Sequence, residues 1–347
     1  MRAENFIYEN SDKFSYLERN EFCVVGIGGA GTNTINRIYN LARNKFYTIS
    51  INTDMNHLSF INADKKILLN LPKGYGTGGD PDIGFRSAYL ARDEIFNALK
   101  GFNVIFIVSG FGGGTGTGAT QVITKIALET GSMVINIVTL PFKAEGSRYR
   151  KALDGIKDLT KVAKTLILLD NNKLLENSPR YLPVEKAFKV MDQLIFMIIH
   201  SFHEMLSNTS NLHISYSEVK NFFAQGKLST IFYNEGTIDN IDSIIKNMVE
   251  TSLADINISS STRAIIFIMS GEELDLDILM RKVVGGLSSQ LSYNENITPG
   301  YVVDKSLDNN VRILVLVTNV IIPAIEERPV SVENKKDIFA KNQNFYL

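Results

Sequence analysis

The chain contains very little cysteine, no long apolar run and almost no net charge. Cys23 is the single cysteine among 347 residues, so no disulfide can form within the chain, which is typical of a reducing compartment. It lies in the apolar run 22–25, where we expect a buried small side chain and not a reactive thiol. The formal net charge of -1 lacks the basic excess that is typical of nucleic-acid-binding proteins.

Membrane and export signals are also missing from the sequence. No stretch reaches the roughly 18 uninterrupted apolar residues of a membrane span, so we expect no direct membrane insertion. Residues 1–20 carry too many charges for a signal peptide. We therefore expect a soluble, cytoplasmic protein with no nucleic-acid partner.

The first half of the chain alternates short apolar runs with segments of helical periodicity. Apolar residues make up 44% and charged residues 21%, as in ordinary globular proteins, and 347 residues suggest two packed domains or one large one. A helix is expected at 34–42, and strands are expected at 22–25, 47–51, 104–108, 133–139 and 165–169. This alternation predicts an α/β fold with a parallel sheet covered on both sides.

Pro183 precedes a different kind of segment. Residues 184–206 contain no Gly or Pro and are apolar nearly all round, which predicts a long helix buried between two domains. A smaller α+β domain should follow, with strands at 229–233, 264–270, 301–304 and 312–318 and helices near 241–253 and 274–291. We divide the chain into an N-terminal extension (1–20), a first domain (21–183), a central helix (184–207), a second domain (208–320) and a flexible tail (321–347). The extension could form a short docking helix or stay mobile.

A glycine-rich loop at 26–33 follows the first expected strand directly and precedes a helix. Gly26, Gly28 and Gly31 satisfy the pattern G-x-G-x-x-G, and Asp54 follows the second strand where a ribose-binding acid is expected. Glycines in such a loop let the backbone approach a phosphate, and the helix N-terminus offers free N–H groups. This loop alone leaves open a phosphate site, an NAD or FAD site and a structural turn.

A second glycine-rich loop at 110–118 again lies between an expected strand and a helix. Six glycines and two threonines in nine positions offer N–H and hydroxyl donors suited to a di- or triphosphate. An NAD-binding oxidoreductase has no use for a second polyphosphate loop. The P-loop pattern G-x-x-x-x-G-K-[ST] is absent, and neither loop contains a lysine. A third cluster at 74–81 could be a surface turn, but we favour a mobile loop that senses a terminal phosphate.

Residues 112–118 read GGGTGTG and resemble the specific signature of the tubulin/FtsZ superfamily. The resemblance to FtsZ covers residues 21–320 and includes GIGGAGTN at 26–33, NTD at 52–54 and LPFKAEG at 140–146. LLDNNKLL at 168–175 and KAFKVMDQL at 186–194 look most like archaeal FtsZ sequences. The resemblance implies a Rossmann-like GTP-binding domain, a central helix and a smaller α+β domain, with GTP or GDP as ligand and Mg²⁺ accompanying the nucleotide.

The resemblance also assigns the nucleotide site residue by residue. Phosphates are implied for the two loops and for the sensor loop, at Gly28, Gly29, Ala30, Gly31, Thr32, Asn33, Gly79, Gly112, Gly113, Gly114, Thr115, Gly116 and Thr117. The ribose acid corresponds to Glu145, and the base contacts correspond to Asn171, Phe188 and Asp192. The arginine that the family usually places four residues after the glutamate is Tyr149 here, and the neighbouring Arg148 could substitute for it.

A second departure from the family concerns hydrolysis. In FtsZ filaments a loop of the next subunit, with the pattern N-x-D-x-x-D, completes the catalytic site. His213 replaces the asparagine, Ser215 the first aspartate and Glu218 the second. Serine carries no charge and glutamate is longer by a methylene, and losing one such group commonly costs ~10²–10⁴ in rate. We expect slow GTP hydrolysis, while sufficiency of Glu218 alone remains an alternative.

The implied function is a filament-forming GTPase that assembles with itself head to tail and acts in cell division or cell shape. The alternative is a scaffold that hydrolyses little and copolymerises with, or regulates, another FtsZ paralogue. Apolar residues within 337–347 could bind a membrane-anchor protein, although we favour a plain disordered end.

Overall fold

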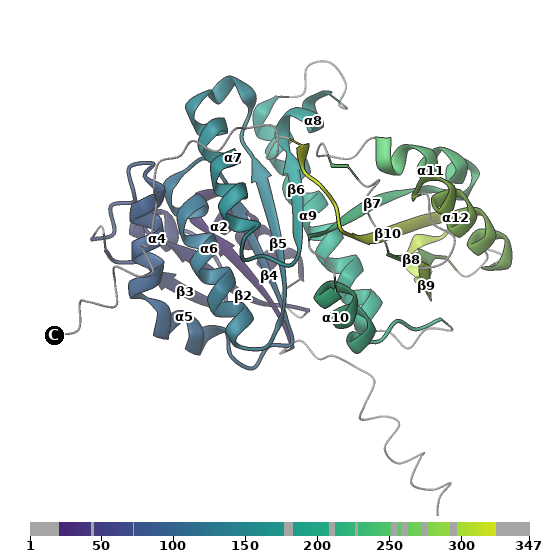
Figure 1. The fold of residues 1–347 in the computed structure, drawn as a ribbon, viewed down its shortest axis with the longest axis horizontal. Helices are drawn as coiled ribbons and strands as arrows, with labels where there is room; N and C mark the ends of the chain where they lie inside the picture. The colour runs from purple at the N-terminus through teal and green to yellow at the C-terminus, as the bar shows by residue number, and fades with distance from the viewer. Residues whose placement is uncertain are drawn as a thin grey trace, which may run out of the picture.

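The computed structural model describes residues 21–42, 45–71, 73–176, 183–207, 212–225, 228–250, 256–257, 263–271, 276–291 and 297–323. Two β-sheets lie on either side of the long helix α9 (Val184–Ser207), with the larger sheet formed by the first half of the chain (Figure 1). The expected α/β domain, central helix and smaller second domain are therefore confirmed.

The larger sheet has six parallel strands in the order β3-β2-β1-β4-β5-β6. Side chains of β1 alternate between two cores, with Val24 in one and Val25 in the other. Burial on both faces explains why these strands read as continuous apolar runs. The strands are β1 (Phe22–Ile27), β2 (Tyr47–Asn52), β3 (Lys65–Leu68), β4 (Val104–Gly110), β5 (Met133–Leu140) and β6 (Leu166–Asp170).

Helices cover both faces of this sheet (Figure 1). Ile35 and Ile38 of α2 pack in the core that contains Val24, while Ile123 and Ile126 of α6 pack in the other. The three-residue spacing places each pair on one helical face. The helices are α2 (Gly28–Ala42), α3 (Met55–Ser59), α4 (Pro81–Leu90), α5 (Arg92–Leu99), α6 (Gly114–Glu129), α7 (Ser147–Leu159) and α8 (Asn171–Glu176), with a 3₁₀ turn η2 at Lys143–Glu145.

Helix α9 joins the two sheets through a single apolar core. Phe202 meets Phe106 of β4 edge to face, with ring centroids 5.5 Å apart, and Phe267 of the second sheet lies in the same cluster. The predicted burial of this helix on several sides is confirmed. None of the helices in the described ranges is long and apolar enough to cross a membrane.

The second sheet is mixed, in the order β7-β10-β8-β9, with β10 antiparallel to both neighbours and β8 parallel to β9. Its strands are β7 (Ser229–Thr237), β8 (Ala264–Ser270), β9 (Ile297–Val303) and β10 (Asn310–Thr318). The helices of this half are α10 (Tyr216–Gln225), α11 (Ile241–Glu250) and α12 (Leu276–Leu291), with 3₁₀ turns η3 (Ile238–Asn240) and η4 (Lys305–Leu307).

The structure departs from the expected elements mainly at sheet edges. Strand β9 begins at Ile297 and not at 301, because an edge strand tolerates Pro299, which lacks an N–H. Strand β3 was not expected, since Lys65 and Lys66 interrupt its apolar pattern. Cys23 is fully buried as expected, and burial, then the nearby Asp64, raises the pKa of its thiol. Our expectations for 1–20 and 324–347 lie outside the described residues, and the domain boundaries remain a proposal.

Candidate functional site

The two glycine-rich loops meet at the point where the strand order of the larger sheet reverses. Strands β1 and β4 are neighbours, and the loops follow their carboxyl ends, where α/β proteins of this topology bind ligands. A cavity of about 830 Å³ opens there, lined by both loops and by residues of α9. The two loops that the sequence places about 80 residues apart therefore form one site.

Glycine serves two different purposes in these loops. A Cβ on Gly29 or Gly113 would meet nothing within 4 Å, so these positions leave the backbone open to a ligand. A Cβ on Gly31 would lie 2.3 Å from Val108 O, and one on Gly116 would lie 2.2 Å from Gly110 O, so these glycines allow close backbone packing. Helices α2 and α6 begin at the cavity, and their first N–H groups suit an anion.

Three of the predicted phosphate ligands stabilise the loops and do not line this cavity. The Thr32 hydroxyl donates to Gly28 O at 2.8 Å. The Thr117 hydroxyl accepts a hydrogen bond of 2.8 Å from Gly112 N. Both threonine side chains are buried. We therefore interpret Gly28, Thr32 and Thr117 as residues that shape the loops.

Asp192 lines the cavity from α9, with only 14% of its side chain exposed. Thr34 Oγ1 donates to its Oδ1 at 2.6 Å, and Arg37 Nε lies 3.4 Å from its Oδ2. Burial raises the pKa of this carboxyl, while the Thr34 hydrogen bond and the Arg37 charge act in the opposite direction. The carboxylate is held on one side by α2 and faces the cavity.

Two further predicted base contacts surround Asp192. Phe188 is 47% exposed, and its ring centroid lies 5.8 Å from that of Phe142. Asn171 is buried, and its Oδ1 accepts no hydrogen bond from the described residues. Both residues line the cavity, so it contains an open aromatic face and an unused buried acceptor. These features fit a planar heterocycle with hydrogen-bond donors.

Glu145 and Arg148 form the rim of the cavity. Arg148 Nη1 lies 2.6 Å from Glu145 Oε2, and Glu145 Oε1 accepts from Phe142 N at 3.0 Å. Tyr149 instead packs against an apolar cluster beneath α7. Arg148 lines the cavity, whereas Tyr149, at the usual family position, does not, and a contact between Arg148 and a nucleotide stays a prediction.

A smaller cavity of about 450 Å³ adjoins the first and contains the predicted sensor loop. The two cavities share wall residues from both glycine-rich loops, including Gly29 and Gly113, and also share Arg148. Gly79 and Gly112 line this second cavity. Lys151 Nζ donates to Gly79 O at 2.7 Å and so links α7 to the sensor loop.

The predicted catalytic residues lie at the opposite edge of the same sheet. Beside them, Tyr216 donates to Asn103 O, which precedes β4, and Lys220 donates to Gly131 O, which precedes β5. Asp192 lines the cavity, and the predicted catalytic residues come after the end of α9 at Ser207. The helix from Asp192 to Ser207 is roughly 22 Å long, at 1.5 Å per residue. His213, Ser215 and Glu218 therefore cannot reach the cavity of their own subunit.

Ser215 and Glu218 form a reciprocal cap at the start of α10. Glu218 Oε2 accepts from Ser215 N and Ser215 Oγ, both at 2.7 Å, and Glu218 N donates to Ser215 Oγ at 3.2 Å. This is a capping box, which satisfies free N–H groups at a helix start. The two hydrogen bonds from Ser215 lower the pKa of Glu218, so its carboxylate is ionised at neutral pH.

Several residues of the site were not found from the sequence. Thr34 and Arg37 line the cavity from α2, and the buried Ser109 Oγ lines it without a partner among the described residues. Lys151 lies in α7 and not in a glycine-rich loop. The sequence contains only a weak signal for Thr34 and Arg37. They are polar residues three positions apart on a helix whose other face is apolar, as in many surface helices.

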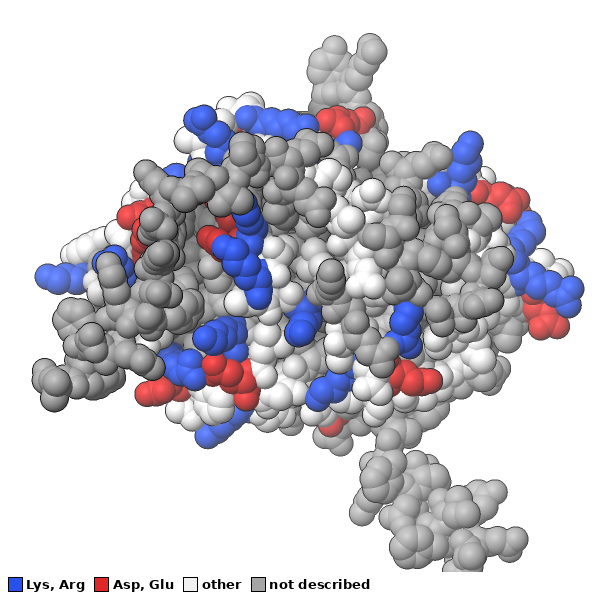
Figure 2. Space-filling model, in the orientation of Figure 1, with Lys and Arg blue, Asp and Glu red and all other residues white. Residues whose placement is uncertain are grey.

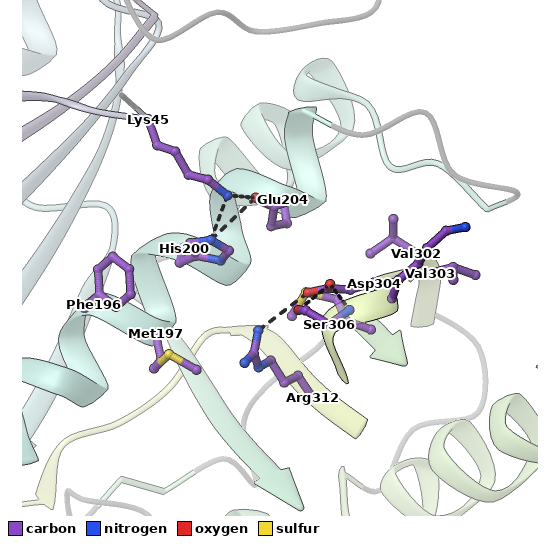
Figure 3. Close-up of a pocket in the computed structure, with 12 residues that line it drawn as sticks. Lys45, Phe196, Met197, His200, Glu204, Val302, Val303, Asp304, Ser306 and Arg312 are labelled. Carbon is purple, nitrogen blue, oxygen red and sulfur yellow. Dashed lines mark hydrogen bonds and ion pairs between the residues drawn. The ribbon is translucent and has the colours of Figure 1, made fainter. Parts of the chain in front are cut away.

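A third cavity, of about 470 Å³, lies between α9 and the second sheet (Figure 3). Its charged side chains already have partners in the protein. Lys45 Nζ lies 2.8 Å from both His200 Nε2 and Glu204 Oε1, while Arg312 pairs with Asp304 across the cavity from them. We interpret this cluster as part of the junction between the domains.

On the face drawn in Figure 2, acidic and basic side chains of the described residues lie near one another and are scattered. No broad surface of a single sign is visible among those residues on this face. The mixed distribution agrees with the net charge of -1.

The strand order, the paired glycine-rich loops and the cavity that they form with the central helix are typical of a nucleotide-binding α/β protein. The chain belongs to the tubulin/FtsZ family, since the model of the "Tubulin/FtsZ family, GTPase domain" matches residues 21–179 and FtsZ relatives match along most of the chain. It is 36% identical over 326 residues to cell division protein FtsZ 2 of Methanocaldococcus jannaschii, covering 91% of this chain and 85% of the relative. FtsZ 2 of Halobacterium salinarum is 35% identical over 300 residues, covering 86% and 76%.

Solved structures agree with this assignment. The empty FtsZ dimer of M. jannaschii superposes with a TM-score of 0.80 at 33% identity, and 92% of each chain is covered. CetZ2 from Haloferax volcanii, described as a GTPγS-bound protofilament, has a TM-score of 0.73 at 19% identity, with 87% of this chain and 93% of that chain covered. The second comparison shows a shared fold. The chain is thus a member of an FtsZ-like family of cell-division GTPases.

Proposed function

We propose that this chain binds GTP and GDP in the larger cavity and polymerises head to tail into filaments that act in cell division or cell shape in the cytoplasm. The observation that carries the proposal is the convergence of two helix N-termini and the Asp192 carboxylate on one cavity. The N–H groups suit phosphates, and a carboxylate accepts the N1–H and amino group of guanine. Adenine offers no equivalent pair of donors.

Mg²⁺ would enter this site with the nucleotide. Within the described ranges, no three His, Cys, Asp or Glu side chains are placed to hold a metal ion. Mg²⁺ commonly keeps several waters and binds through phosphate oxygens and one or two protein groups. The residues present therefore fit an ion carried by the nucleotide, which would neutralise phosphate charge.

Head-to-tail assembly follows from the separation of the two parts of the active site. In Figure 1, helix α8, which follows the carboxyl end of β6, lies near the top of the described part of the molecule, and helix α10 lies near its lower edge. A cavity at one end and a catalytic loop at the other can act together only between two subunits. Contacts between unlike surfaces repeat into open filaments.

We expect GTP hydrolysis in these filaments to be slow. Ser215 contributes no charge, and one oxygen of Glu218 is engaged in the capping box. A single carboxylate oxygen outside that cap would then polarise the attacking water, where the family pattern supplies two carboxylates. Loss of one positioning group commonly costs ~10²–10⁴ in rate.

Phosphate release with GTP, measured together with light scattering over a range of protein concentrations, tests this proposal. We expect assembly with turnover that is low and rises with the fraction of assembled protein. Rapid turnover would show that Glu218 suffices. Turnover independent of assembly would contradict a catalytic site shared between subunits.

A non-hydrolysing scaffold that copolymerises with a standard FtsZ is the second candidate, and the uncharged Ser215 favours it. Adding a standard FtsZ to the chain separates the two functions, because a scaffold would enter its filaments and lower phosphate release per subunit. Binding of a membrane-anchor protein by the C-terminal tail also remains a proposal, and those residues lie outside the described ranges.

A further inference from the structure

The smaller cavity continues directly from the part of the larger one where the helices begin. The two share Gly29, Gly113, Gly114, Thr115 and Arg148 as common walls. A diphosphate bound at the start of α6 would therefore direct its next substituent into the smaller cavity. The far wall of that cavity is the glycine-rich sensor loop, including Gly78 and Gly79.

Lys151 supplies a positive charge to this smaller cavity from outside both glycine-rich loops. Its side chain leaves α7 and reaches the sensor loop, where Nζ donates to Gly79 O at 2.7 Å. An ammonium group has three N–H donors, so Lys151 can keep this bond and still donate to a second acceptor. The Asp54 carboxylate in the same cavity is engaged, because it accepts from His57 N at the start of α3.

We propose that Lys151 binds the third phosphate of the nucleotide and thereby couples that phosphate to the position of the sensor loop. This inference rests on the proposed guanine-nucleotide site. With a diphosphate, Lys151 bridges only α7 and Gly79. With a triphosphate, the same ammonium joins Gly79 O and a phosphate oxygen, so the third phosphate gives the sensor loop an additional anchor.

The test compares the dissociation constants of a non-hydrolysable GTP analogue and of GDP, below the concentration at which the chain assembles. Charge-assisted hydrogen bonds predict that Lys151→Met weakens the analogue about 10- to 100-fold. Affinity for GDP should stay within about twofold of the unmodified chain, by the same argument. Lys151→Arg should recover most of the loss. Lys157→Met, on the same helix and outside both cavities, is the matched control and should leave both constants unchanged.

Hydrogen–deuterium exchange of the peptide 74–80 provides a second readout. The analogue should slow exchange there in the unmodified chain and in Lys157→Met, but not in Lys151→Met. Equal weakening of GDP and analogue, or an unchanged ratio between them, would overturn the assignment of Lys151. Failure of the unmodified chain to bind either nucleotide would instead overturn the proposed function, and this inference with it.

Discussion

Asp192 is largely buried, and the proposed recognition of guanine requires its carboxylate to be ionised so that it accepts two donors. Burial raises its pKa, while the Thr34 hydroxyl and Arg37 stabilise the charged form. Asp192→Asn keeps the shape of the side chain but replaces one acceptor with a donor. We expect it to weaken GTP binding about 10- to 100-fold, as for loss of charged hydrogen bonds, in an equilibrium titration.

The same residue predicts a pH dependence of binding. As pH falls through the raised pKa of Asp192, the carboxylate gains a proton and affinity for guanine nucleotides falls. Thr34→Val removes a hydrogen bond that favours ionisation, so this pKa should rise and affinity should begin to fall at higher pH. Dissociation constants measured from pH 4.5 to 8 check this, with Thr160→Val as control because the Thr160 hydroxyl donates to Lys157 O at the end of its own helix and does not line the cavity. Identical profiles for both variants would contradict the role of Thr34.

The first turn of helix α10 contains the capping box of Ser215 and Glu218, which are also the proposed catalytic residues. Ser215→Ala removes the Oγ that accepts from Glu218 N, and we expect a loss of about 1 kcal/mol in the free energy of unfolding. Aspartate is as good a cap as serine. Ser215→Asp should therefore keep an acceptor for Glu218 N, lose the hydrogen bond that Ser215 Oγ donates to Glu218 Oε2, and add a carboxylate at the proposed subunit contact.

The two substitutions at Ser215 thus separate the structural from the catalytic role. We expect Ser215→Asp to raise phosphate release in assembled protein about 10-fold or more, since a positioned group contributes ~10²–10⁴. Denaturant unfolding and phosphate release measured on both variants check the prediction. A Ser215→Asp variant that folds and assembles but releases phosphate no faster than the unmodified chain would contradict the proposed effect of serine on hydrolysis.

The elements that could be predicted from sequence are those whose apolar pattern is continuous. Helix α9 and strands β1 and β4 were placed within one or two residues, because burial on several sides requires apolar residues throughout. Strand β3 was missed because an edge strand tolerates lysines. The local apolar pattern of the sequence therefore predicts burial well, but it predicts the pairing of strands at a sheet edge poorly.

The residues of the candidate site also fall into those that the sequence reveals and those that only the fold brings together. The glycine-rich loops are visible because several glycines adjoin one another, and Asp192 was assigned through the family resemblance. Its partners Thr34 and Arg37 are about 155 residues away in sequence and look like ordinary polar helix residues. Lys151 became a candidate only when the fold placed α7 beside the sensor loop.

At the scale of the whole molecule, the junction between the domains contains a partly buried histidine, His200. Lys45 donates to His200 Nε2, which must therefore carry a lone pair, and Figure 3 shows both beside Glu204. Burial is the main cause that lowers the pKa of His200 to about 4, and the positive charge of Lys45 lowers it further. Glu204 acts in the opposite direction, while His203 and Arg312 have smaller lowering effects.

This histidine predicts a loss of stability in acid. In the unfolded chain His200 gains a proton below about pH 6.5, whereas the folded chain resists protonation until about pH 4. Between these values the free energy of unfolding should fall with decreasing pH, by about 3 kcal/mol in total. Denaturant unfolding at pH 7 and pH 4.5 measures the fall, which His200→Gln should reduce and the exposed-site control His213→Gln should not. Parallel pH dependence in both variants would contradict this role of His200.

The central claim is that a guanine nucleotide in the larger cavity drives head-to-tail assembly of this chain. Electron microscopy and sedimentation of the purified chain with GTP, GDP, ATP or no nucleotide, and of Asp192→Asn with GTP, test it most directly. The account predicts filaments with GTP, little or no assembly with ATP or without nucleotide, and none with Asp192→Asn at the same concentration. Filaments that form equally well with ATP, or without nucleotide, would contradict it.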